Sequence, residues 1–266
     1  SVKAGMVIEK IDGQTITPNR DFASYLNRKE GKFTLLEIVD PALKGEEARQ
    51  QITVQPIGLG EERGLLYKRW VKMNEKEVLE KSNGQLGYVH IPGMSDGPYR
   101  NIYEQMMGKF LDKKGIIVDT RFNGGGDLVA DLAMFFTGVP FISYETEARK
   151  VGGEPTSRWT KPTLAMFNES MYSDGHCFAS GYTDLQIGKT VGMPVPGTCS
   201  FAGWEGLPNG SYWGVVPVSA KNKAGEWMEN NQTEPMIQVK NMPGKIDKGI
   251  DQQLERSIEE LLKDVK

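Results

Sequence analysis

Short apolar runs alternate with segments of helical spacing from Gln85 onwards. Three of these runs are predicted strands, at residues 87–91, 115–120 and 163–167. Two segments between them are predicted helices, at residues 98–111 and 128–136. Strands that alternate with helices are joined by crossover connections. The order therefore predicts an α/β fold with a largely parallel sheet.

Four further elements are expected in the same half of the chain. Residues 141–146 are a predicted strand, and a helix is predicted to begin after Ser173. Residues 211–218 and 225–229 are predicted to pair as a hairpin. Apolar residues recur on one face of residues 247–265 with charges on the other, which predicts an amphipathic closing helix.

Residues 1–57 have a different character and predict a small β-rich module. The expected strands lie at residues 6–11, 32–39 and 50–55, with a short helix at residues 19–29 capped by Asn19 or Asp21. Residues 58–84 are charged and connecting, and residues 64–73 are interpreted as a strand. Pro and Gly residues favour a domain boundary near 57–62.

Composition excludes several classes of function. The formal net charge of −3 argues against a nucleic-acid partner, and no apolar run is long enough to predict a membrane span.

Cys177 and Cys199 have no pairing motif, so free buried thiols are the default and a disulfide is the alternative in an oxidising compartment. No Cys and His cluster has metal-ligand spacing, and we expect neither a metal nor a cofactor. The start at Ser1 suggests a fragment or a processed product.

Two junctions between a strand and a helix are the candidate site. Residues 124–126 are three consecutive glycines after a buried strand, and their backbone amides can bind an anion or an oxyanion. The glycines match neither a phosphate-binding loop nor a dinucleotide-binding fingerprint. Ser173 lies at the second junction, where a hydroxyl can act as a nucleophile beside free helix amides. The alternative is that Ser173 only caps its helix.

The motifs around both junctions resemble one family of enzymes. Residues 118–126 (Val-Asp-Thr-Arg-Phe-Asn-Gly-Gly-Gly) look like an element of the carboxy-terminal processing and tricorn-core serine peptidases. The Asn168-Glu169-x-x-x-Ser173 segment is similar to their nucleophile segment, and the Ser-Asp-Gly that follows resembles the tricorn branch. Residues 187–192 resemble the next strand of that family, and residues 231–235 and 251–254 resemble its ending. The resemblance implies a crotonase-like core over residues 85–266.

The resemblance also implies roles for single residues. Ser173 would be the nucleophile, and Gly124 or Gly125 together with Asp174 would form the oxyanion hole. Glu229 would be the acidic catalytic residue, with Glu234 as the second candidate. No Lys stands in residues 197–203, where one branch of the family carries its base.

The general base is not identified in this sequence. In the tricorn branch, a His and a companion Ser come from a helical domain that precedes the resembling part, so the resemblance implies a base outside these residues. Of the two histidines present, His90 is expected to be structural. His176, one helical turn after Ser173, is the less favoured candidate for the base.

Residues 3–16 resemble the second half of a bacterial PDZ domain, the alternative being a generic β-meander. The predicted organisation is a partial PDZ-like module at 1–57, a connecting segment at 58–84 and the peptidase core at 85–266.

The predicted function is hydrolysis of peptide bonds in a peptide or an unfolded polypeptide. A non-catalytic peptide- or ligand-binding relative is the alternative, and an acyl-CoA enzyme of the crotonase type is disfavoured. Assembly into a homo-oligomer is left as an open possibility, and the resemblance favours a periplasmic over a cytoplasmic location.

Overall fold

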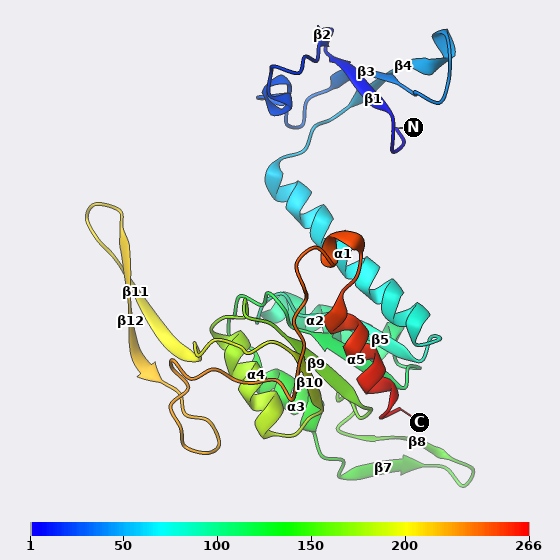
Figure 1. Ribbon diagram of the computed structural model, residues 1–266. Coiled ribbons are helices and arrows are strands. Elements are labelled where there is room, and N and C mark those ends of the chain that lie inside the picture. The colour runs from blue at the N-terminus through cyan, green and yellow to red at the C-terminus, as the bar shows by residue number, and fades with distance from the viewer. Residues whose placement is uncertain (1, 266) are drawn as a thin grey trace. The chain divides into compact units, whose positions relative to one another are not determined.

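The computed structural model describes residues 2–265, which divide into two compact units (Figure 1). The first unit is Ser1–Trp70 and the second is Val71–Lys266. Helix α1 (Leu59–Lys81) runs through the division, and each unit is described by itself. No helix among residues 2–265 has the length and the apolar character that crossing a membrane requires.

The first unit is an antiparallel sheet of four strands in the order β2-β1-β3-β4. The strands are β1 (Val7–Ile11), β2 (Gln14–Thr15), β3 (Thr34–Val39) and β4 (Arg49–Val54). Alternate residues of β3 are buried, including Leu36 and Ile38, and they pack with Ile11 and Tyr25. The strands expected from the sequence are confirmed. The expected helix is a short 3₁₀ helix, Phe22–Leu26, with Asp21 as its cap.

The expectation of a strand at residues 64–73 is wrong, because these residues lie within α1. No proline interrupts Leu59–Lys81, and the segment is rich in Glu, Lys, Leu and Arg, which favour helices. An ion pair between Lys81 and Glu77, one turn apart, adds to the helix near its end.

The second unit contains a five-stranded parallel sheet in the order β13-β10-β9-β6-β5. Its strands are β5 (Leu86–His90), β6 (Gly115–Asp119), β9 (Thr163–Phe167), β10 (Lys189–Gly192) and β13 (Ile237–Gln238). Every residue of β5, β6 and β9 is buried, as expected of strands covered on both faces. The α/β fold predicted from the alternating pattern is confirmed.

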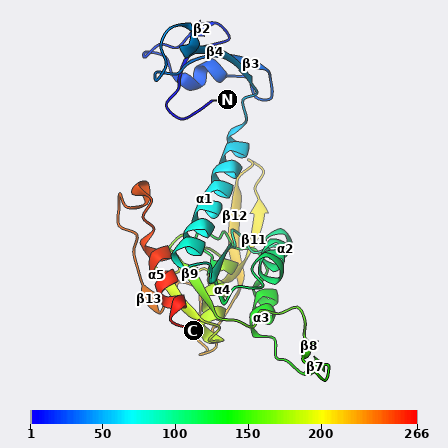
Figure 2. The same cartoon turned by 90° about the vertical axis from the view of Figure 1, so that its right-hand side faces the viewer.

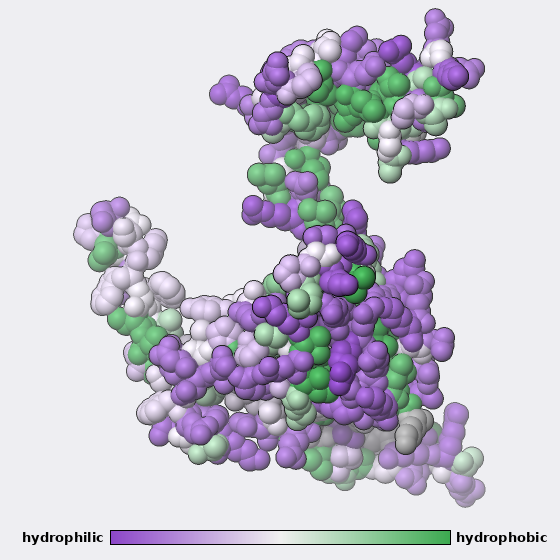
Figure 3. Space-filling view, in the orientation of Figure 1, coloured by the Kyte–Doolittle hydropathy of each residue, from purple (hydrophilic) through white to green (hydrophobic). Residues whose placement is uncertain are grey.

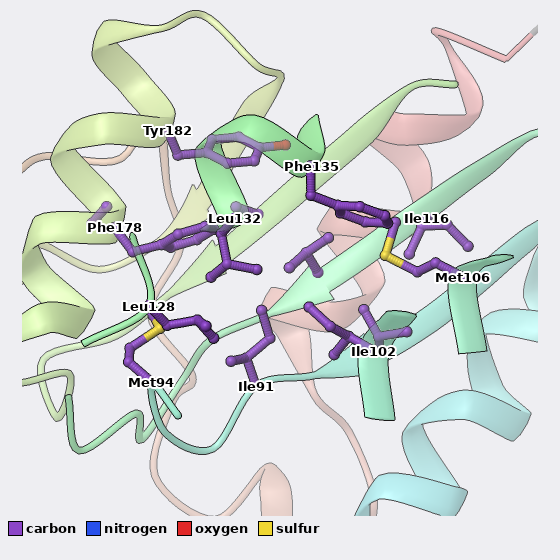
Figure 4. Close-up of a cluster of buried hydrophobic side chains, with 14 of the residues drawn as sticks. Ile91, Met94, Ile102, Met106, Ile116, Leu128, Leu132, Phe135, Phe178 and Tyr182 are labelled. Carbon is purple, nitrogen blue, oxygen red and sulfur yellow. The ribbon is translucent and has the colours of Figure 1, made fainter. Parts of the chain in front are cut away.

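Helices cover both faces of this sheet. Three of them, α2 (Asp96–Glu104), α3 (Val129–Thr137) and α4 (Asp174–Asp184), share a buried core with one face, and α2 continues into the π-helical turn Gln105–Lys109. Figure 4 shows this core, in which Leu132, Phe135 and Phe178 pack against the strands. Helix α5 (Gln252–Leu262) and Val78 of α1 pack on the other face, and Figure 2 shows α5 opposite α2 and α3.

The closing helix begins later than the sequence pattern indicates. The expected range of 247–265 contains a separate 3₁₀ turn, Ile246–Lys248, which ends at Gly249 in the left-handed conformation. Helix α5 then starts after Asp251, whose carboxylate accepts a hydrogen bond from the Leu254 amide at 3.1 Å. The cap therefore sets the start of the helix.

Two antiparallel ribbons extend from the second unit, β7 (Ile142–Glu145) with β8 (Lys150–Glu154) and β11 (Ser200–Gly206) with β12 (Tyr212–Ser219) (Figure 1). The predicted pairing of 211–218 with 225–229 is wrong. An Asn209-Gly210 turn instead joins the first segment to the strand before it. Apolar residues such as Phe201 and Val218 are exposed on this ribbon, and Figure 3 shows its pale and green surface.

A buried ion network fixes the end of β6 to the start of α5. The guanidinium of Arg121 donates to the carboxylates of Asp119 at 2.7 Å and of Asp251 at 2.8 Å. Burial alone would raise the pKa of Asp119, but the charge and hydrogen bonds of Arg121 bring it below its usual value. Arg121 therefore favours the ionised form of Asp119 in the interior.

Replacing Arg121 with methionine is expected to lower the free energy of unfolding by about 3–5 kcal/mol, because two buried carboxylates lose their partner. Urea denaturation measures the change. The matched control is Arg100→Met, which removes an ion pair with Asp96 that is largely exposed to solvent. A loss as small for Arg121→Met as for the control would show that the network is not stabilising.

Candidate active site

The two junctions predicted from the sequence lie side by side at the carboxyl ends of neighbouring strands. Strands β6 and β9 pair in parallel, with Asp119 opposite Met166. The loop with the three glycines follows β6, and the segment that leads to Ser173 follows β9. Parallel α/β sheets place their sites at this edge.

Two buried asparagines join these loops. The side-chain oxygen of Asn168 accepts a hydrogen bond from the Phe122 amide at 2.9 Å. The backbone oxygen of Asn123 accepts one from the Tyr172 amide at 2.9 Å, and its side chain donates to the Ile91 carbonyl. Asn123 and Asn168 are 0% and 5% exposed, so water does not compete for these bonds. The asparagines thus fix the glycine loop against the turn that carries Ser173.

Ser173 has a conformation that non-glycine residues rarely adopt, with φ 54° and ψ −123°. It stands at the cap position of α4, but its hydroxyl makes no capping hydrogen bond. The structure therefore does not support the alternative in which Ser173 only caps the helix. Its amide donates to the Thr198 hydroxyl at 2.9 Å, which links the turn to the segment before β11.

The glycine loop packs directly against this turn. A Cβ added to Gly125 would lie 2.6 Å from the Cβ of Ser173, and Gly125 has a φ of +88°. A Cβ added to Gly126 would lie 1.9 Å from the Met94 carbonyl oxygen. Both positions therefore require glycine, for close approach and for their backbone conformation.

The hydrogen bonds of the loop disagree with the expectation that Gly124 or Gly125 supplies an oxyanion donor. The Gly124 amide donates to the Pro92 carbonyl at 3.3 Å, and the Gly125 amide to the side-chain oxygen of Asn123 at 2.8 Å. Within residues 2–265, the amides of Gly126 and Asp174 have no acceptor, and both residues line one cavity with Ser173. The sequence shows three glycines but not which amide the fold leaves unpaired.

Asp174 contributes its amide to the cavity and its carboxylate to the scaffold. The carboxylate accepts a hydrogen bond from the Leu128 amide at 2.7 Å, just before α3. Burial raises the pKa of Asp174, and the hydrogen bonds from the Leu128 and Val129 amides act in the opposite direction. This bond is a further connection between the two junctions, beside those made by Asn123 and Asn168.

The cavity has a volume of about 310 Å³ and brings Ser173 together with Glu229. A Glu229 carboxylate oxygen accepts a hydrogen bond from the Ser200 hydroxyl at 2.5 Å. Phe201, Trp204 and Val216 of the β11–β12 ribbon form an apolar wall. Glu234, the second acidic candidate, is exposed and bonds to Gln232 and Gln238 instead. Sequence reasoning missed Ser200, because no local pattern marks a bond that spans 29 residues.

Neither histidine offers a ring nitrogen to Ser173. His90 is buried, and its Nε2 contacts the Arg121 carbonyl oxygen at 2.9 Å. His176 is 1% exposed, with Nδ1 and Nε2 both hydrogen-bonded to other residues. His176 is therefore excluded as the base in this conformation.

Cys177 and Cys199 form a disulfide, so the expectation of free thiols is wrong. The fold brings them together because His176 and Thr198 already join α4 to the segment before β11. The disulfide lies one residue beyond each of these contacts in the sequence. It closes a loop that spans the strand β10.

Removal of the disulfide by Cys177→Ala with Cys199→Ala is expected to lower the free energy of unfolding by about 3 kcal/mol, since the cross-link restricts the unfolded chain. Chemical denaturation with and without a reducing agent measures this. The reducing agent should destabilise the wild type and leave the double variant unchanged. Equal stability of the oxidised wild type and the variant would contradict the expectation.

Comparisons with known proteins point to one family of peptidases. The sequence profile of Peptidase family S41 matches residues 85–239. The chain is 26% identical over 281 residues to the tricorn protease of Thermoplasma acidophilum, covering 98% of this chain and 24% of that protein. It is 30% identical over 226 residues to the tricorn protease of Thermoplasma volcanium, covering 78% of this chain and 20% of that protein.

A crystal structure of the tricorn protease matches with a TM-score of 0.81 at 24% identity, over 98% of this chain and 25% of that chain. This likeness shows the fold. The resemblance to tricorn-type peptidases inferred from the motifs is confirmed by these matches. The chain spans about a quarter of the length of these curated relatives.

Proposed function

Because the chain belongs to peptidase family S41, we propose that it is the part of a serine peptidase that carries the nucleophile, Ser173. The observation that carries this proposal is the position of Ser173: a strained turn beside two unpaired amides, in a cavity shared with Glu229. A strained turn between a strand and a helix is how α/β hydrolytic enzymes expose a nucleophilic serine.

The proposed reaction is acyl transfer. The Ser173 hydroxyl attacks the peptide carbonyl carbon, and the oxygen that becomes negative accepts hydrogen bonds from the Gly126 and Asp174 amides. The C–N bond then breaks, the amine leaves with a proton, and water hydrolyses the ester on Ser173. Glu229 is the proposed acidic member of the site, and Ser200 fixes its carboxylate.

The proton acceptor for Ser173 is proposed to come from outside these residues. Both histidines in the sequence have ring nitrogens engaged elsewhere, and no lysine stands in residues 197–203. The relatives are about four times as long as this chain, which leaves room for a part that supplies the base. The whole protein would act on peptides or unfolded polypeptides.

The test compares cleavage of unfolded casein by the 266-residue chain alone and by the longer protein that the proposal requires, in which this chain is joined to the part that supplies the base. The proposal predicts cleavage by the longer protein and turnover by the chain alone lower by at least about 10²-fold, the usual contribution of a general base. Peptide binding by the longer protein with no cleavage would favour the alternative, a binding protein on the same scaffold. That alternative gains support from the occupied histidine nitrogens.

The finer parts of the architecture are proposed with the function. The parallel sheet with its covering helices is the proposed crotonase-like core, at residues 85–266. The antiparallel sheet within residues 1–57 is the proposed partial PDZ-like module, and 58–84 is the proposed connecting segment. The disulfide favours an oxidising compartment. Assembly into a homo-oligomer remains a possibility raised by the sequence.

A further inference from the structure

His176 connects three segments around the proposed nucleophile. Its Nδ1 accepts hydrogen bonds from the amides of Thr198 at 3.1 Å and of Cys199 at 3.0 Å. Its Nε2 lies 2.9 Å from the Thr233 hydroxyl. Two N–H groups directed at Nδ1 require that this nitrogen carries no proton, so the ring is neutral with its proton on Nε2.

Thr198 links this histidine to Ser173. The Thr198 amide donates to His176, while the Thr198 hydroxyl accepts the Ser173 amide at 2.9 Å. The position of Thr233 is fixed as well, because the backbone amide of Thr233 donates to Val195 and the Val195 amide donates to Thr233. A change at the histidine ring can therefore reach the Ser173 amide through Thr198. The His176 backbone amide also donates to the Ser173 carbonyl at 2.9 Å, independently of the ring.

We propose that His176 is a positioning residue, whose neutral ring holds residues 198–199 and through Thr198 sets the backbone turn of Ser173. Protonation of Nδ1 removes both accepted bonds and releases this segment. The inference rests on the proposed function in that it takes Ser173 as the nucleophile. It gives this site a pH dependence that comes from a residue other than the proton acceptor.

The surroundings of the ring determine the direction of that dependence. Burial lowers the pKa of His176, and the charge of Glu229 raises it by less. The neighbouring cysteines are joined in a disulfide and do not titrate. Because the folded pKa is below the unfolded value of about 6.5, the unfolded chain binds more protons below pH 6.5. The stabilisation by His176 is present above that pH and is lost as pH falls towards the folded pKa.

Two variants distinguish the role of Nδ1 as a hydrogen-bond acceptor from the role of the ring's volume. His176→Asn keeps an oxygen acceptor near the position of Nδ1 and does not titrate, whereas His176→Phe keeps a ring without an acceptor. Thr233→Val is the control that removes the Nε2 partner and leaves Nδ1 in place. The dispersion of ¹H–¹⁵N spectra of the 266-residue chain shows whether each variant folds.

The deciding measurement is a pH titration of the backbone amides of Ser173, Thr198 and Cys199 in those spectra. In the wild type and in Thr233→Val, the three amides should shift with one apparent pKa below 6.5, and this transition should be absent in His176→Asn. Exchange of the Thr198 and Cys199 amides should rise at least tenfold in His176→Phe and stay near wild type in His176→Asn. The inference would be overturned if the Ser173 amide shifted with an apparent pKa different from that of the Thr198 and Cys199 amides. It would also be overturned if the shared transition were still present in His176→Asn.

Reaction of Ser173 with a fluorophosphonate in the longer protein gives a second readout. At pH 7, His176→Phe should slow the reaction at least tenfold, and His176→Asn should remain within about threefold of the wild type. Equal rates in both variants would also overturn the inference. A wild type that does not react at all contradicts the proposed function instead, while the amide titration still decides the role of His176.

Discussion

Replacing Ser173 with alanine is expected to lower kcat/KM for peptide cleavage by the longer protein by about 10⁴-fold or more. The hydroxyl is the proposed attacking group, and the oxyanion donors alone provide only a small part of the rate of a serine peptidase. The fold should be unchanged, because the Ser173 hydroxyl makes no capping bond to α4 and its amide remains bonded to Thr198.

Ser170 provides the matched control, since it is exposed and lies three positions earlier in the same segment. Ser170→Ala should retain wild-type kcat/KM. Steady-state kinetics on one peptide substrate measure both variants at equal enzyme concentration. If Ser173→Ala kept more than about a tenth of the activity, a serine nucleophile at this position would be excluded, given the rate losses expected for such residues.

A methyl group at Gly125 is expected to lower kcat/KM by about 10²-fold or more and to destabilise the fold by about 1–3 kcal/mol. The added Cβ would lie 2.6 Å from Ser173 Cβ, 2.8 Å from the Tyr172 carbonyl oxygen and 3.0 Å from the Asp174 amide nitrogen. The turn that carries the nucleophile would have to move, and the φ of +88° adds backbone strain. Thermal denaturation and kinetics measure the two effects separately.

Gly124→Ala is the control from the neighbouring position. Nothing lies within 4 Å of a Cβ added there, and its φ is outside the left-handed region. Gly124→Ala should therefore keep wild-type activity and stability. Equal loss in the two variants would indicate that the loop as a whole is sensitive, and would remove the specific role assigned to the contact between Gly125 and Ser173.

The sequence predicted the parts of the site that depend on local signals. The apolar strands β6 and β9 and the helix start after Ser173 are each marked within a few residues, so the two junctions were located correctly. Their adjacency followed from the parallel order of the strands. These signals need no knowledge of contacts between distant residues.

The rest of the site depends on contacts that no local pattern encodes. The bond from Ser200 to Glu229 and the disulfide from Cys177 to Cys199 join residues more than 20 positions apart. The amide of Gly126 is left without an acceptor among the described residues because Pro92 and Asn123 accept hydrogen bonds from the amides of Gly124 and Gly125. His176 was the less favoured candidate for the base, but the sequence did not show which groups its ring would contact. The fold turns the ring towards Thr198 and Thr233.

The most direct test of Ser173 as the nucleophile is to treat the longer protein with a fluorophosphonate and to map the modified residue by mass spectrometry. We expect one adduct at Ser173, absent in Ser173→Ala and retained in Ser170→Ala. An adduct on a different residue, or none in a preparation that cleaves peptides, would contradict the assignment of Ser173 as the nucleophile.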